Sequence, residues 1–213
     1  MTIGSADLAL APARPAKPAH KVIHPLWVRI THWINAVALL VMLTSGWRVY
    51  NASPLFRFEF PPAVSLGDGL ADGLLWHFAA MWLFVVNGLV YVTLGIATGR
   101  FRRKLLPVRA GDVVRDIGAA LTGKLSHDDL SVYNAVQRLL YIGVILAGLL
   151  AVVSGLSIWK PVQVQELTTV FGGYDAARYV HFVAMAVIAA FLVIHISLAF
   201  LVPKSLRAMI LGR

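Results

Sequence analysis

Hydrophobic positions along the chain gather into four long runs, and the segments between them are polar and rich in proline and glycine. The runs cover about residues 27–50, 74–98, 139–159 and 179–202. A helix needs roughly 20 apolar residues to cross the hydrocarbon core of a bilayer. An open sheet would leave backbone groups without hydrogen-bond partners in lipid. We therefore predict an all-α transmembrane four-helix bundle at 26–213, which follows a disordered tail at 1–25.

The composition supports lipid as the solvent. Hydrophobic residues make up 59% of the chain and charged residues 14%, whereas soluble domains are about 25% charged. The chain has no cysteine, which excludes thiolate-bound iron–sulfur clusters, covalently attached haem and disulfides. Any redox centre on this chain must use other ligands, and histidine is the obvious candidate.

Lysine and arginine are distributed unequally between the two ends of the runs. Of the 19 basic residues, one side has only Arg48, Arg57, Lys160 and Arg178. Because basic loops stay in the cytoplasm, we predict that both termini and the loop between the second and third runs are cytoplasmic. The net charge of +9 then needs no nucleic-acid partner. Within that loop, residues 111–123 form a short amphipathic piece, which is either a membrane-surface segment or a solvated connector.

Four of the seven histidines lie inside the runs, at His32, His77, His181 and His195. An ionisable residue in a transmembrane segment suggests a functional site. His181 and His195 are 14 residues apart, so they project from one helix face about 21 Å apart along the axis. By depth, His32 matches His195 on the cytoplasmic side, and His77 matches His181 on the outer side.

Two facing imidazoles at one depth suit a flat macrocycle with two axial ligands, which predicts one haem iron per pair. Cross-helix hydrogen bonds or a proton path are the alternative. A zinc or di-iron site fits less well, because the four runs contain no carboxylate.

Arginines and glycines near the histidine pairs are candidates for the surroundings of the haems. Arg48 and Arg178 on the outer side, and Arg29 and Arg138 on the inner side, are candidates for haem propionates, although snorkelling explains each equally well. Thin helix walls are predicted at Gly46, Gly88, Gly95, Gly143, Gly148 and Gly155. Close helix approach alone also explains such glycines.

Several passages resemble the cytochrome b subunits of membrane-bound bacterial respiratory enzymes. They are "RITHWINAVALLVMLTSGW" in the first run, "WHF" in the second, "YNAVQR" and "IWKP" around the third, and the 14-residue histidine spacing in the fourth. The resemblance covers nearly all of the chain after residue 25. It is strongest to the gamma subunit of formate dehydrogenase, with the cytochromes b of hydrogenase and thiosulfate reductase as relatives.

The resemblance implies two b haems on the same four histidines, in a multi-pass protein of the bacterial inner membrane. It also implies a quinone site near the inner haem, where Asn134 and Gln137 would contact the quinone unless they cap the helix. The partners would be an iron–sulfur subunit and a molybdenum or nickel–iron catalytic subunit. The expected function is electron transfer between this periplasmic partner and the quinone pool, in either direction, as the quinone-reactive subunit of a multisubunit oxidoreductase. A stand-alone cytochrome b that exchanges electrons between quinone and superoxide, and a haem-free anchor or proton-path protein, are the alternatives.

Overall fold

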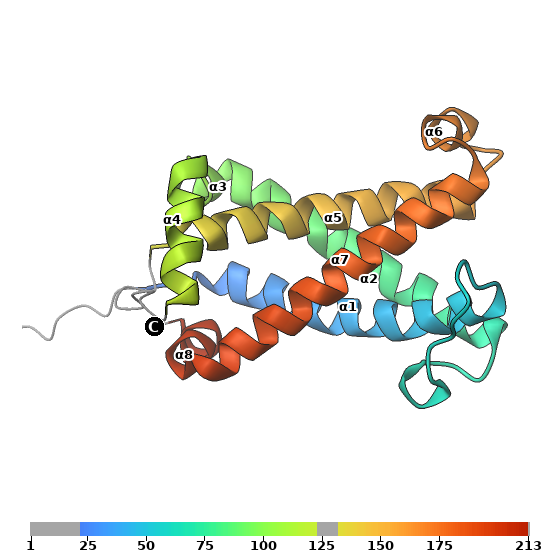
Figure 1. Cartoon of the computed structure of the whole chain (residues 1–213), viewed down its shortest axis with the longest axis horizontal. Helices are drawn as coiled ribbons and strands as arrows, with labels where there is room; N and C mark the ends of the chain where they lie inside the picture. Colours follow the sequence, from blue (N-terminus) through green and yellow to red (C-terminus); the bar gives the residue numbers. More distant parts are fainter. Residues whose placement is uncertain (1–21, 123–131, 213) are drawn as a thin grey trace, which may run out of the picture.

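The computed structural model describes residues 22–122 and 132–212, and in it the four runs are long helices. They are α1 (Leu26–Ala52), α2 (Leu70–Ala97), α5 (Ala135–Trp159) and α7 (Tyr174–Leu201). Each is long and apolar enough to cross a membrane. Figure 1 shows them running together as one elongated bundle. The described residues contain no strand, and the predicted all-α transmembrane fold is confirmed.

Three of the helices begin four or five residues before the positions expected from hydrophobicity. The first turns of α2 and α7 contain Asp72 and Asp175, whose charges interact favourably with the helix N-terminus. Asn134 caps α5 with its side chain. These first turns are polar because they lie at the edge of the apolar region, so hydropathy alone misses them.

The shorter helices lie at the two ends of the bundle (Figure 1). One end has α3 (Arg100–Lys104), α4 (Ala110–Leu121) and α8 (Pro203–Leu211), and we call it the inner end. The other has α6 (Gln165–Val170) and a 3₁₀ turn at Pro62–Val64, and we call it the outer end. Ile23 N donates to Gly212 O at 2.9 Å, so both ends of the described chain lie together at the inner end. Its cytoplasmic location stays a prediction, and the expected tail lies outside the described residues except for 22–25.

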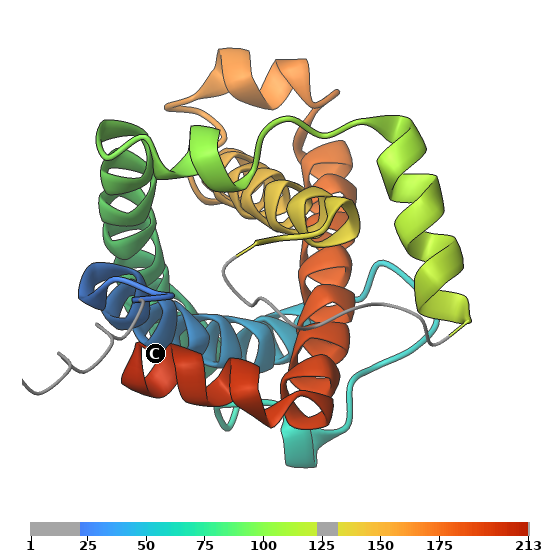
Figure 2. The same ribbon diagram turned by 90° about the vertical axis from the view of Figure 1, so that its left-hand side faces the viewer.

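The predicted amphipathic piece is helix α4, and it is attached to the bundle at the start of α5. Asp116 Oδ2 accepts a hydrogen bond from the backbone N–H of Ala135 at 2.7 Å. In the end-on view of Figure 2, α4 and α8 lie beside the four long helices and not among them.

Among the long helices, close packing occurs mainly within two hairpins, α1 with α2 and α5 with α7. Between the hairpins, long side chains make the contacts. Phe78 and Trp82 of α2 meet Trp159 of α5, with ring centroids 5.2 and 6.3 Å apart. The fully buried side chains of the bundle are small, including Ser45 and Ser154 at 0% exposure. The backbones of the two hairpins are therefore held apart by a distance that large rings span.

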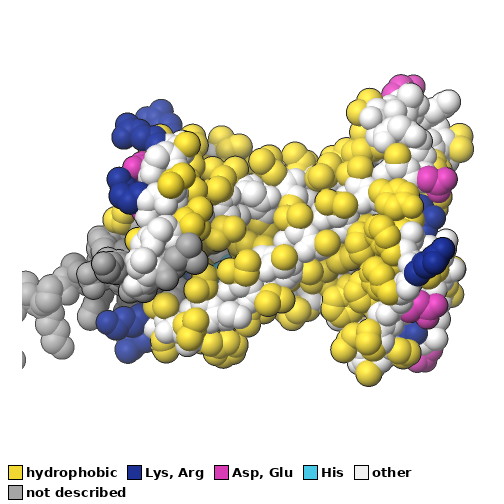
Figure 3. Space-filling view, in the orientation of Figure 1, with side chains coloured by type: hydrophobic (Ala, Val, Ile, Leu, Met, Phe, Trp, Pro, Cys, Tyr) yellow, Lys and Arg dark blue, Asp and Glu magenta, His cyan; other side chains and the backbone are white. Residues whose placement is uncertain are grey.

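The outer surface of the bundle is apolar between two charged ends. On the face drawn in Figure 3, hydrophobic side chains cover the middle of the long helices and the charged groups lie at the two ends. Large residues such as Trp82 and Leu89 are 58% and 64% exposed. An exposed apolar surface of this size is favourable in contact with lipid and unfavourable in contact with water.

A buried amide joins α1 to α2, and its removal should measurably loosen the first hairpin. Asn87 Nδ2 donates to Thr31 O at 2.8 Å and to Asn35 Oδ1 at 2.7 Å. We expect Asn87→Leu to lower the free energy of unfolding by about 1 kcal/mol, as for other hydrogen bonds between transmembrane helices. Thermal unfolding in detergent measures the change. Ser197→Ala is the matched control, because among the described residues Ser197 bonds within its own helix, to Val193 O. An equal change in both variants would contradict the prediction.

Candidate functional site

The structure brings the four transmembrane histidines together in the two pairs that depth predicts. At the outer level, His77 of α2 faces His181 of α7, with ring centroids 6.4 Å apart and an interplanar angle of 68°. At the inner level, His32 of α1 faces His195 of α7, at 5.9 Å and 64°. Helix α7 contributes one histidine to each pair.

The spacing within each pair fits a metal ion between two imidazoles. With each metal–nitrogen bond at about 2 Å, the ring centroids would lie roughly 6 Å apart, and the observed separations are close to this. In the described part of the chain, no group of three or more His, Asp and Glu side chains converges. Paired imidazoles with no third ligand suit the two axial positions of haem iron better than a zinc or di-iron site.

Each outer histidine is held by a backbone carbonyl and a serine hydroxyl of the neighbouring helix, and we call each of these two sets of contacts a cradle. His77 Nδ1 lies 3.1 Å from Met42 O and 3.2 Å from Ser45 Oγ. His181 Nδ1 lies 2.9 Å from Ala151 O and 3.1 Å from Ser154 Oγ. Because a carbonyl oxygen only accepts, Nδ1 carries the proton in each ring, and Nε2 is left to bind a metal.

A glycine beside each serine lets the histidine ring lie against the helix backbone. A Cβ atom on Gly46 would lie 3.4 Å from Cε1 of His77, and one on Gly155 would lie 3.1 Å from Cε1 of His181. Two of the six glycines predicted to form thin walls thus face a histidine. Gly95 and Gly148 face Phe101 and Phe84, and Gly88 and Gly143 have no atom within 4 Å of such a Cβ.

The two cradles are one motif repeated in the two hairpins. In both α1 and α5 the accepting carbonyl is three residues before the serine and the glycine is one after it, at 42–46 and 151–155. The histidine is the eighth residue of α2 and of α7. Sequence reasoning missed these cradles. A Ser–Gly pair within the first helix of each hairpin is the signal that would have found them.

The inner pair has a different environment. His32 meets Trp33 edge-on at 5.3 Å, and His195 stacks on Phe191 at 5.5 Å. Within the described residues, the ring nitrogen atoms of His32 and His195 form no hydrogen bond. In contrast, Nδ1 of His77 and Nδ1 of His181 are both hydrogen-bonded. The two sites therefore offer a bound group different electronic surroundings.

At the outer end, unpaired donors remain beside the cradle of α1. The Nε atom of Arg48 and the Nε1 atom of Trp47 are buried without a hydrogen-bond partner in the described part of the chain. A buried unpaired donor requires an explanation, and an anionic propionate would supply the missing acceptor. Arg48 also donates to Ser65 O at 3.2 Å. Arg178 instead donates to Ser53 and pairs with Asp175 at 3.8 Å.

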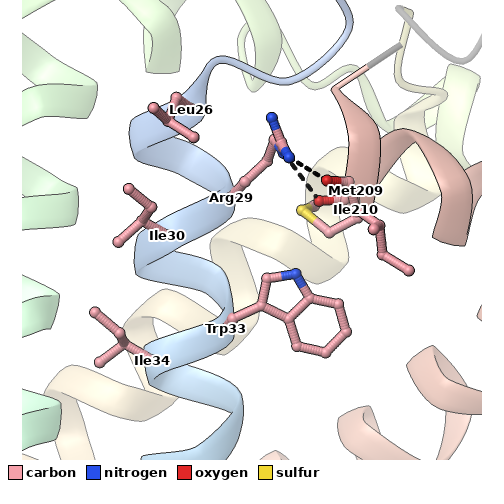
Figure 4. A pocket seen from close by; sticks show the side chains of 7 residues that line it. All are labelled: Leu26, Arg29, Ile30, Trp33, Ile34, Met209 and Ile210. Atoms are coloured by element: carbon pink, nitrogen blue, oxygen red, sulfur yellow. Dashed lines mark hydrogen bonds between the residues drawn. The ribbon is translucent and has the colours of Figure 1, made fainter.

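At the inner end, both candidate arginines hold backbone segments in place. Arg138 donates to Tyr133 O at 3.0 Å and to Pro107 O at 2.9 Å. Arg29 donates to Met209 O at 3.3 Å and to Ile210 O, which ties α1 to the end of α8. Figure 4 shows these two bonds at the edge of a cavity of about 340 Å³, where Trp33 also points inward. A propionate role for either arginine stays a prediction.

The two residues expected to contact quinone form a helix cap. Asn134 Oδ1 accepts from Gln137 N at 2.8 Å, and Gln137 Oε1 accepts from Asn134 N at 3.1 Å. This reciprocal pair is a capping box. Both side-chain oxygens are thus used at the start of α5, and a quinone contact would fall to the amide NH₂ groups.

His24 is expected to make the attachment of the N-terminal segment sensitive to pH. Burial, followed by the charge of Arg100, lowers the pKa of His24 from 6.5 to about 4. The Arg100 guanidinium lies 3.4 Å from His24 Nδ1, so a protonated ring is disfavoured in the folded state. Between pH 6.5 and 4 the unfolded segment binds more protons, and stability falls as the pH falls.

We therefore expect hydrogen exchange of the Ile23 amide, which is bonded to Gly212 O, to gain protection steadily as the pH rises through this window, after correction for intrinsic rates. In His24→Gln the protection should no longer depend on pH. A dependence that persists in this variant would show that another group controls the attachment.

Comparison with known proteins identifies the family. The family described as prokaryotic cytochrome b561 matches residues 23–212. The chain is also 48% identical over 190 residues to the putative protein-methionine-sulfoxide reductase subunit YedZ1 of Azospira oryzae, covering 89% of this chain and 96% of the relative. The predicted b-type cytochrome of the inner membrane is thus confirmed, whereas the formate dehydrogenase type is not shown. The chain belongs to the prokaryotic cytochrome b561 family, multi-pass inner-membrane proteins that bind b-type haem and transfer electrons.

Proposed function

We propose that this chain is the dihaem membrane subunit of a protein-methionine-sulfoxide reductase. In this proposal it takes electrons from quinol near the inner end and delivers them to a catalytic subunit at the outer end. The observation that carries the dihaem assignment is the presence of two histidine pairs at metal-ligand spacing, at two depths of the bundle. The relative that is 48% identical and named as a subunit of such a reductase supports the choice of partner.

The four histidines would hold one haem at the outer level and one at the inner level. His77 and His181 would ligate the outer haem, with Ser45 and Ser154 orienting them. His32 and His195 would ligate the inner haem. When bound, haem supplies one-electron oxidation and reduction at its iron.

The unpaired donors of Trp47 and Arg48 would hold a propionate of the outer haem. Arg178 is a weaker candidate, because the outer loop already uses it. Asn134 and Gln137 would contact the quinone, as predicted, through their amide NH₂ groups, because their side-chain oxygens cap α5.

The overall reaction balances without another reductant. Quinol oxidation releases two electrons and two protons, and reduction of a sulfoxide consumes two of each and yields methionine and water. With the predicted topology, each electron moves outward toward the positive side of the membrane. This movement is favourable by about 2.3 kcal/mol per 100 mV, so the membrane potential would help to drive the reaction. Reverse flow, from the partner to quinone, would conserve energy instead.

Family membership and the relative bear on the alternatives. Haem binding by the prokaryotic cytochrome b561 family disfavours a haem-free anchor or proton-path protein. The relative is named as a subunit, which favours a partner enzyme over a stand-alone exchange between quinone and superoxide. An iron–sulfur subunit is not required by either observation.

The proposal is tested by following haem reoxidation in the complex purified with its co-expressed partner. The haems are reduced with a quinol under anaerobic conditions, and protein-bound methionine sulfoxide is then added. We expect both haems to reoxidise only when the partner subunit is present. The isolated chain is the control, and superoxide is added to it separately. Reoxidation by superoxide alone, with no response to sulfoxide in the complex, would replace this function by the stand-alone one.

A further inference from the structure

The repeat of the two hairpins extends to the inner level, where tyrosines replace histidines. When Ser45 is aligned with Ser154, His32 aligns with Tyr141 of α5. When His77 is aligned with His181, His195 aligns with Tyr91 of α2, since 14 residues separate the members in both helices. The two helices without an inner histidine thus have a tyrosine at the corresponding depth.

A third tyrosine links this pair to the polar inner end. The rings of Tyr133 and Tyr141 lie 5.1 Å apart, edge to face. The charge of Arg100 lies near enough to the Tyr133 phenol to interact with it, and Lys104 Nζ lies 5.9 Å from the centre of the same ring. The phenols of Tyr91 and Tyr141 are near enough to interact electrostatically with Tyr133 and with each other. We call Tyr91, Tyr133 and Tyr141 the tyrosine cluster.

The hydroxyl groups of this cluster are not needed for packing alone. At the outer end, the aromatic cluster consists mainly of phenylalanine, with Phe56, Phe58 and Phe60 packed around Tyr50 and Phe182. A phenylalanine ring packs as well as a tyrosine ring and places no polar group in an apolar region, where such a group is costly to bury. Half-buried phenols at about the depth of the inner histidine pair therefore indicate polar chemistry.

The chemistry that this position requires is the movement of protons. If quinol is oxidised near the inner haem, as proposed above, its two O–H bonds break and its electrons leave toward the haem. Its protons must then reach the aqueous phase from a site within the apolar bundle. A phenol accepts a proton on its oxygen while it releases its own, whereas a phenylalanine cannot.

We propose that the tyrosine cluster is a proton-transfer route between the inner histidine level and the aqueous phase at the inner end. This inference rests on the proposed oxidation of quinol. Each proton enters at Tyr91, passes to Tyr141 and leaves from Tyr133 to water, so the loss of any one phenol interrupts the route. Arg100 does not accept the proton, because a guanidinium has no acceptor atom. Arg100 positions Tyr133 and stabilises the phenol oxygen of Tyr133 while the phenol proton leaves.

The test uses the intact complex with single Tyr→Phe substitutions, which remove one oxygen atom and keep the ring. Tyr91→Phe and Tyr141→Phe are compared with Tyr179→Phe, the matched control at the outer end, where the ring packs on Phe56 at 5.8 Å. Stopped-flow absorbance follows haem reduction by a quinol in H₂O and in D₂O. Haem content and dithionite-reduced spectra are recorded for each protein.

We expect both cluster variants to be reduced about 100-fold more slowly by quinol, as when a positioned proton carrier is lost, with a larger solvent isotope effect. Their haem content and dithionite-reduced spectra should be unchanged, and Tyr179→Phe should behave as the parent protein does.

Three results would overturn the proposal. Unchanged quinol kinetics in both cluster variants would show that the phenols carry no protons, while the proposed function would stand. Slower reduction with loss of haem, or without a changed isotope effect, would show a structural role only. A parent protein with two haems that quinol does not reduce would overturn the proposed quinol chemistry and this route together.

Discussion

Replacing His195 with alanine is expected to remove the inner haem and leave the outer one, and replacing His181 is expected to do the reverse. Each substitution would delete one of the two histidines proposed to hold that haem, and one imidazole alone should bind it much more weakly. Pyridine haemochrome quantitation should give about two haems b per parent chain and about one in each variant. Quinol-dependent sulfoxide reduction should be lost in both.

A redox titration distinguishes which haem remains. The outer imidazoles donate from Nδ1 to backbone carbonyls, and in the described part of the chain the inner ones do not, so the two proposed haems should titrate as separate components. Each variant should lack a different component. His127→Ala is the control for a histidine outside the transmembrane helices, although position 127 lies outside the residues that the structure describes. A colourless parent protein, or one haem that is indifferent to both substitutions, would refute the assignment.

Replacing Gly155 with valine is expected to weaken binding of the outer haem strongly without changing any of the four histidines. A Cβ at this position already lies 3.1 Å from Cε1 of His181, and the two further methyl groups of valine need the space that the ring occupies. The ring would leave its contacts with Ala151 O and Ser154 Oγ. Loss of such supporting contacts lowers metal affinity about 10- to 100-fold, and a displaced ligand should sit at the upper end of this range.

The matched control for this prediction is Gly143→Val on the same helix. A Cβ on Gly143 would have no neighbouring atom within 4 Å, so this position has the space that Gly155 lacks. Optical spectra and haem quantitation of both variants decide the result. If both variants lost the outer haem equally, a general disturbance of α5, and not the contact with His181, would be responsible.

Features that depend on a single helix could be predicted from the sequence. The placement of two helices against each other could not. The depth of His195 relative to His181 follows from the helix rise alone, so the pairing by depth could be predicted. The contact of His181 with Ala151 O depends on the register between α5 and α7, which one sequence does not reveal. The arginines show the same limit. Arg29 can be assigned to an end of the bundle from sequence, but its bonds to α8 cannot.

The capping of α5 lies between these cases. The pattern Asn–x–x–Gln is a local signal of a capping box, and capping is one of the two roles that the sequence predicts for Asn134 and Gln137. The structure uses their oxygens in this way. Local chemistry of this kind is readable from sequence, because all of its atoms belong to one turn of one helix.

The separation of the two hairpins has a consequence for how the protein is made. Each hairpin is bonded within itself, and large rings rather than close-packed backbones join the two. A ligand that binds only the joined state stabilises that state by mass action, and the outer and inner histidine pairs both reach across the junction. We therefore expect the two hairpins to insert into the membrane separately and haem binding to join them. The amount of this protein in a cell would then follow haem biosynthesis, because unjoined halves remain open to membrane proteases.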